Sequence, residues 1–159
     1  MNRKTQTLLD KNQKETTVTN TYHILLAEDD KEMRALIALS LRKGGYRVTE
    51  CGDGIGLLTH LEPFLLPKGI GDKDVGLIIS DIRMPGLTGM ELLAGKPKNE
   101  GFPPIILITA FGDKETHAQA KELGAAAMFN KPFDMDDLLT IVHEFLPPNE
   151  KAGDNQEQR

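Results

Sequence analysis

The sequence has little cysteine and no long apolar stretch. Its one cysteine, Cys51, excludes an internal disulfide framework. The position of Cys51, just past a strand-like segment, predicts a buried structural thiol. No apolar run approaches the length that a membrane-spanning helix requires, and the basic N-terminal region lacks the apolar segment of a signal peptide. We therefore expect a cytoplasmic protein that does not enter a membrane.

Basic residues are not concentrated anywhere in the chain. Lys and Arg form no dense run and the formal net charge is −5, which argues against a nucleic-acid-binding surface. Apolar residues make up 39% of the chain and charged residues 27%, a balance typical of a soluble globular protein. The length of 159 residues suits one domain with modest extensions. We expect no DNA-binding domain in this chain.

The two ends of the sequence differ in composition from its middle. Residues 1–20 and 149–159 are largely polar, which predicts a flexible leader and a flexible tail. Pro147-Pro148 closes the last helical pattern. The expected domain therefore covers residues 22–146.

Within this domain, short apolar segments alternate with helical patterns. Strands are predicted at residues 23–27, 46–50, 75–80, 104–108 and 126–129. Helical periodicity predicts helices at 33–41, within 54–66, from Met90 to the interruption at Gly95, at 113–123 and after Asp134. Five strands that alternate with five helices predict an α/β fold, a parallel sheet covered by helices on both faces.

Polar residues that can carry chemistry follow the predicted strands. The acidic run Glu28-Asp29-Asp30 follows the first strand, Asp81 follows the third, Thr109 ends the fourth and Lys131 follows the fifth. The carboxyl ends of parallel strands meet at one rim of the sheet, where ligands bind. The sequence therefore predicts one pocket that holds carboxylates, a hydroxyl and an ammonium group.

This combination suits phosphoryl transfer. Clustered carboxylates repel one another unless a cation is present, and ligands that are all oxygen suit Mg²⁺, which also bridges to phosphate oxygens. A metal ion and Lys131 can neutralise a phosphoryl group, and Thr109 can donate a hydrogen bond to it. Asp81 can then attack phosphorus as a carboxylate nucleophile and form an acyl phosphate.

Four sequence motifs, in this order, resemble the receiver domains of two-component response regulators. They are Ile24–Asp30 (ILLAEDD), Ile78–Gly86 (IISDIRMPG), Ile106–Ala110 (ILITA) and Asn130–Phe133 (NKPF). The resemblance spans residues 22–146. It implies a flavodoxin-like, doubly wound sheet of five parallel strands in the order 2-1-3-4-5.

The resemblance also implies a role for each residue of the predicted pocket. The implied roles are phosphoacceptor for Asp81, Mg²⁺ ligands for Glu28, Asp29 and the backbone carbonyl of Arg83, and phosphoryl contacts for Thr109 and Lys131. In this family the Lys-Pro bond that corresponds to Lys131-Pro132 is often cis.

Several positions depart from the family pattern. Met128 stands where an aromatic residue commonly turns inward on activation, and Phe129 should point to the opposite face of its strand. Glu28 stands where Asp is commoner. The segment 67–74 is longer than usual and reads as a loop insertion, and the helix after Gly89 looks short.

We expect the chain to work as a stand-alone receiver and not as an enzyme. A sensor histidine kinase or a phosphotransfer protein would donate the phosphoryl group, and the phosphorylated form would favour one of two conformations. The signal would pass to a separate protein, which by resemblance docks on residues 113–146. Alternatively, the chain relays the phosphoryl group to another carrier.

Two other functions compete with this interpretation. A phosphatase of the haloacid-dehalogenase type also uses an Asp nucleophile and Mg²⁺, but it needs a second Asp two residues later, where this chain has Arg83. A degenerate receiver that serves only as a scaffold would usually have lost one of its reactive groups. Asp81, Thr109 and Lys131 are all present.

Each candidate residue also has a purely structural interpretation. Asp81 can be a turn or cap residue, the run Glu28-Asp29-Asp30 a favourable charge at a helix start, Thr109 a strand former and Lys131 a surface residue. The four motifs together favour the functional interpretation, except at Asp30, which we expect to serve the helix. The histidines show no ligand spacing and are expected to be structural or at the surface: His23, His60, His117 and His143.

Overall fold

The computed structural model describes residues 21–65, 74–98 and 101–148. The predicted leader 1–20, the predicted tail 149–159 and all but the last residue of the predicted insertion 67–74 lie outside the described residues. Among the described residues, no helix is long and apolar enough to cross a membrane.

Five parallel strands form one sheet in the order β2-β1-β3-β4-β5, which confirms the predicted topology. The strands are β1 (His23–Ala27), β2 (Arg47–Cys51), β3 (Leu77–Asp81), β4 (Ile105–Thr109) and β5 (Ala127–Asn130). Every residue of β3 and β4 is buried, because parallel strands in the middle of a sheet are covered on both faces.

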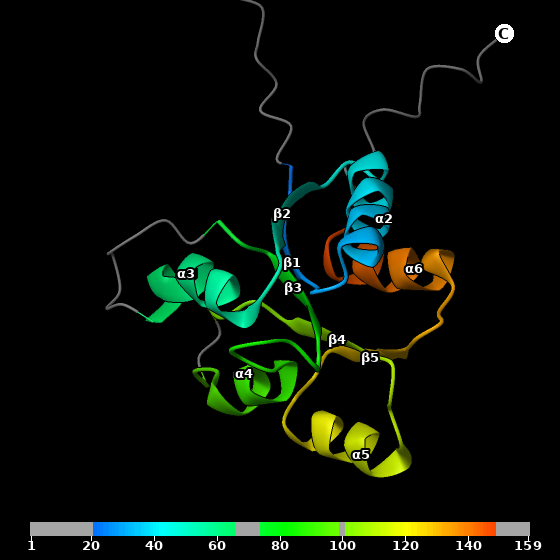
Figure 1. The fold of residues 1–159 in the computed structure, drawn as a ribbon. Coiled ribbons are helices and arrows are strands. Elements are labelled where there is room, and N and C mark those ends of the chain that lie inside the picture. Colours follow the sequence, from blue (N-terminus) through cyan, green and yellow to red (C-terminus); the bar gives the residue numbers. More distant parts are fainter. Residues whose placement is uncertain (1–20, 66–73, 99–100, 149–159) are drawn as a thin grey trace, which may run out of the picture.

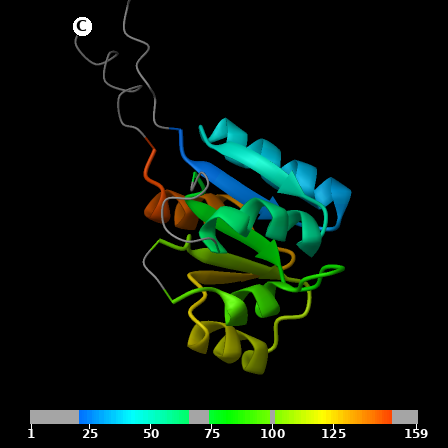
Figure 2. The ribbon, with the colours of Figure 1, turned by 90° about the vertical axis from the view of Figure 1, so that its left-hand side faces the viewer.

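Helices cover both faces of the sheet (Figures 1 and 2). The helices are α2 (Lys31–Lys43), α3 (Gly54–Leu65), α4 (Gly89–Gly95), α5 (Lys114–Glu122) and α6 (Met135–Phe145). Figure 1 shows α2 and α6 on one face and α3, α4 and α5 on the other. Two hydrophobic clusters correspond to these faces, so the sheet separates two cores.

Short polar side chains fix where the helices begin. The carboxylates of Asp30, Asp113 and Asp134 each accept a hydrogen bond from a backbone N–H in the first turn of α2, α5 and α6. Gly45 and Gly124 have φ values of 93° and 92°, a left-handed conformation that ends α2 and α5 at little cost. Particular residues therefore define the starts of α2, α5 and α6 and the ends of α2 and α5.

Cys51 is the last residue of β2 and its side chain is buried, as the sequence predicted. Burial raises the pKa of the thiol to about 11, and the nearby Asp53 carboxylate adds to this effect. The thiol therefore stays protonated at neutral pH, which fits a structural role.

We predict that Gly54→Ala destabilises the domain by about 1–3 kcal/mol. Gly54 starts α3 against the loop after β3, where its N–H donates to the carbonyl oxygen of Pro85 at 3.0 Å. A methyl group on Gly54 would lie 2.3 Å from the backbone nitrogen of Leu87, which cannot move aside as a flexible side chain would. Urea unfolding measures the change.

Gly95→Ala is the matched control, because, apart from its chain neighbours and the backbone of its own helix, no atom of the described residues lies within 4 Å of a methyl group at Gly95. We expect its free energy of unfolding to equal or slightly exceed that of the wild type. Equal losses in the two variants would contradict the close approach at Gly54.

Candidate functional site

The polar residues that follow the strands meet at the carboxyl rim of the sheet. Glu28 follows β1, Asp81 ends β3, Thr109 ends β4 and Lys131 follows β5. The side chains of Glu28, Asp81 and Thr109 are buried even though they are polar. Burial of this kind requires partners for each group.

Lys131 is the partner that the two buried carboxylates share. Its Nζ lies 2.9 Å from both Oε1 and Oε2 of Glu28 and 2.7 Å from Oδ2 of Asp81. Burial lowers the pKa of Lys131, but the hydrogen bonds to Asp81 and Glu28 outweigh this effect and the pKa is raised overall. Lys131 therefore remains a cation between the two carboxylates.

The ionised form of Glu28 is disfavoured at this site, mainly because the side chain is buried. Burial raises its pKa to about 7; the hydrogen bond from Lys131 opposes this increase, and the Asp81 carboxylate adds to it. One ammonium group thus does not fully compensate the negative charge gathered here. Glu28 is part protonated near neutral pH when no other cation is bound.

Three carboxylates at the rim could hold a metal ion. Glu28, Asp29 and Asp81 each offer an oxygen, and these oxygens lie within 4.8 Å of one another. When all three are ionised they carry a charge of −3, and the +1 of Lys131, which pairs with Glu28 and Asp81, reduces this to −2. The oxygen ligands and the charge deficit both fit a hard divalent cation.

The backbone after β3 orients Asp81. The N–H of Arg83 donates to Oδ1 of Asp81 at 2.9 Å, while Oδ2 faces Lys131. The guanidinium carbon of Arg83 lies 4.6 Å from the centre of the Phe111 ring, and both side chains are exposed at the rim. The predicted metal contact of the Arg83 carbonyl remains a prediction.

The side chain of Thr109 is hydrogen-bonded to the loop that follows β4. Its Oγ1 accepts a hydrogen bond from the N–H of Phe111 at 3.1 Å, in the loop that leads to α5. Its carbonyl oxygen accepts from the N–H of Lys131 at 2.7 Å, so β4 and β5 remain joined beside the site. The Lys131-Pro132 bond is cis.

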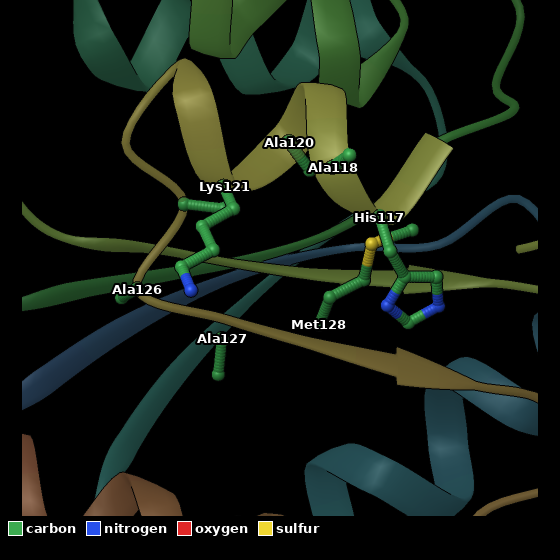
Figure 3. A pocket seen from close by; sticks show the side chains of 8 residues that line it. His117, Ala118, Ala120, Lys121, Ala126, Ala127 and Met128 are labelled. Carbon is green, nitrogen blue, oxygen red and sulfur yellow. The ribbon is translucent and has the colours of Figure 1, made fainter. Parts of the chain in front are cut away.

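Met128 and Phe129 point to opposite faces of β5, as the strand alternation predicted. Phe129 packs on the core under α6, where its ring centre lies 5.8 Å from that of Phe133. Met128 points toward α5 and lines a pocket of about 410 Å³ (Figure 3). Five alanines, Lys121 and His117 form the rest of this pocket.

The sequence interpretation missed Arg34, which supports the acidic loop from α2. Its guanidinium donates to the carbonyl oxygen of Glu28 at 2.7 Å and lies 3.7 Å from a carboxylate oxygen of Glu50. An Arg one helical turn after an acidic run was the available signal. The interpretation also missed that His117 and Asn130 form a hydrogen bond, at 2.9 Å.

Comparison with known proteins identifies relatives over most of the chain. The family described as response regulator receiver domain matches residues 24–143. The transcriptional regulatory protein FixJ of Bradyrhizobium diazoefficiens is 32% identical over 134 residues, which cover 84% of this chain and 61% of FixJ. The sporulation initiation phosphotransferase F of Bacillus subtilis is 30% identical over 78% of this chain and 93% of that protein.

Solved structures agree with the sequence comparison. The receiver domain of Francisella response regulator 1452 has a TM-score of 0.68 at 25% identity and covers 79% of this chain and 96% of that one. The chemotaxis response regulator CheY4 of Vibrio cholerae has a TM-score of 0.64 at 26% identity, over 79% and 99% of the two chains. The fold, the arrangement of the rim and these matches lead to one conclusion: the chain belongs to the response regulator receiver domain family of two-component systems.

Proposed function

We propose that this chain is a phosphoaccepting receiver in which Asp81 takes a phosphoryl group from a sensor histidine kinase or a phosphotransfer protein, with Mg²⁺ at Glu28 and Asp29. The observation that carries this proposal is the Asp81 carboxylate itself. It is 5% exposed at the rim, one of its oxygens is bonded to an ammonium group, and two further carboxylates lie beside it.

The proposed transfer uses groups that already surround Asp81. A carboxylate oxygen of Asp81 attacks phosphorus, and the bond from phosphorus to the donor's histidine nitrogen breaks. Lys131 stabilises the charge on the phosphoryl oxygens, and Thr109 turns its hydroxyl to donate to one of them. Glu28, Asp29 and the Arg83 carbonyl would hold Mg²⁺, which supplies positive charge beside the transferring group.

Phosphorylation then changes what the domain binds or where the phosphoryl group goes. A shift toward a second conformation would alter the face formed by residues 113–146, the proposed docking site for a separate protein. Relay to another carrier is the second candidate, because a relative that this chain covers to 93% is named a phosphotransferase. In either case residues 22–146 act in the cytoplasm as a signalling module and not as an enzyme.

Incubation with acetyl phosphate and Mg²⁺ is expected to add the mass of one phosphoryl group to the intact protein. The adduct should be absent from Asp81→Asn, which keeps the shape of the side chain but loses the nucleophilic oxygen. Intact-mass spectrometry measures both. Asp30→Asn is the matched control, because Asn caps a helix as well as Asp does and the site's carboxylates remain.

Three results would count against the proposal. An adduct that persists in Asp81→Asn would place the acceptor elsewhere. The absence of an adduct from acetyl phosphate and from any histidine kinase would favour a scaffold, and turnover of a phosphorylated metabolite would favour a phosphatase.

Binding of Mg²⁺ is expected to strengthen as the pH rises from 6 to 8. The pKa of Glu28 is raised to about 7, so the fraction of Glu28 that is ionised increases about tenfold over this range, and only the ionised form binds a cation. Isothermal titration calorimetry at each pH measures the affinity. Glu28→Gln should bind weakly and lose this pH dependence, whereas an equally steep dependence in that variant would show that another group titrates.

A further inference from the structure

Three segments meet behind Thr109, on the side of the sheet that faces α5. Nε2 of His117 in α5 lies 2.9 Å from Oδ1 of Asn130, the last residue of β5. A methyl group on Gly112, in the loop before α5, would lie 2.0 Å from that Asn130 oxygen and 2.9 Å from Nε2 of His117. A glycine at this position therefore lets the loop approach the hydrogen bond closely.

Thr109 belongs to the same junction. It pairs with Asn130 in the parallel register of β4 and β5. Its Cγ2 methyl would lie 2.8 Å from a Cβ on Gly112, while its hydroxyl accepts from the N–H of Phe111. Both branches of the Thr109 side chain thus contact the loop that carries α5.

Rotation of Thr109 must therefore disturb this junction. The hydroxyl and the methyl group share one carbon, so a change of χ1 moves both together between staggered positions. If the hydroxyl turns toward a phosphoryl group on Asp81, its bond with Phe111 is lost and the methyl group leaves its place beside Gly112. The backbone that packs against Asn130 and His117 then has to readjust.

Helix α5 itself contributes little to the core on this face of the sheet. Ala120 is its one buried residue. The pocket of about 410 Å³ between α5 and β5 is lined mainly by alanines, and Figure 3 shows Met128 and His117 side by side at one end of it. Among the described residues, the pair His117 and Asn130 forms the side-chain hydrogen bond that joins α5 to β5.

We propose that the hydrogen bond between His117 and Asn130 is a latch that holds α5 in the position of the unphosphorylated protein. Reorientation of Thr109 strains the junction at Gly112 and releases the latch, so that α5 moves when Asp81 is phosphorylated. The inference rests on the proposed function and adds two positioning residues to it. Neither residue touches the phosphoryl group.

Removal of the latch is expected to speed phosphorylation. His117→Ala and Asn130→Ala should each react with acetyl phosphate about two- to fivefold faster than the wild type, because a solvent-accessible hydrogen bond stabilises the resting form only modestly. Hydrogen exchange should quicken at the amides of α5 and stay unchanged in α2 and α6. A merely structural defect would slow phosphorylation or leave its rate unchanged.

Two variants make the test specific. His117→Gln can place an amide nitrogen near the position of Nε2, donate to Asn130 and restore both the rate and the exchange pattern of the wild type. Gln119→Ala removes an exposed polar side chain from the same helix without touching Asn130, and it should behave as the wild type does.

The outcomes separate the latch from the proposed function. Unchanged or slower phosphorylation in both alanine variants, with α5 exchange as in the wild type, would overturn the latch. So would failure of His117→Gln to restore the rate. If the wild type forms no adduct at all, the proposed function fails. Faster hydrogen exchange confined to α5 in the two alanine variants would still support the contact between His117 and Asn130 as a restraint on α5.

Discussion

The ammonium group of Lys131 lies between Glu28 and Asp81, and the candidate site depends on this contact. Glu28 follows β1, Asp81 ends β3 and Lys131 follows β5, so one cation joins the central strands to the edge of the sheet. Two buried carboxylates at the rim would otherwise repel each other in a medium of low polarity. Lys131 contacts both carboxylates and keeps them together. Asp29, the third carboxylate of the site, is exposed.

Lys131 does not fully neutralise the carboxylates, and Glu28 shows this most directly. Its longer side chain reaches Lys131 with both oxygens, yet its pKa is raised to about 7 because it is buried and lies beside Asp81. Glu28 is therefore the carboxylate that can take up a proton at the site and release it when another cation binds. The guanidinium of Arg34 donates to the backbone carbonyl of Glu28 and so helps to fix the backbone at this position.

Much of this structure follows from local patterns in the sequence. Continuous apolar runs predicted the central strands, Asp113 and Asp134 marked helix starts, and the polar residues after the strands predicted the rim. The fourth strand ends at Thr109 as predicted, whereas three others end one residue later than predicted, at Cys51, Asp81 and Asn130. At Asp81 and Asn130, backbone pairing continues past the last apolar side chain. The contact between His117 and Asn130 could not be predicted, since it depends on how α5 lies over β5 and no local signal encodes that.

Met128 stands where receiver domains commonly carry an aromatic residue, and this difference supports the latch proposed between His117 and Asn130. An aromatic side chain there would fill space between β5 and α5 and position the helix by packing. Met128 is flexible and its neighbours are alanines, so the pocket remains open and packing determines the position of α5 only loosely. Because α5 buries one residue, Ala120, a single hydrogen bond would be a large share of the free energy that holds this helix in place. The proposed latch would then allow α5, joined to the site through Thr109 and Asn130, to move while Lys131 keeps the site itself rigid.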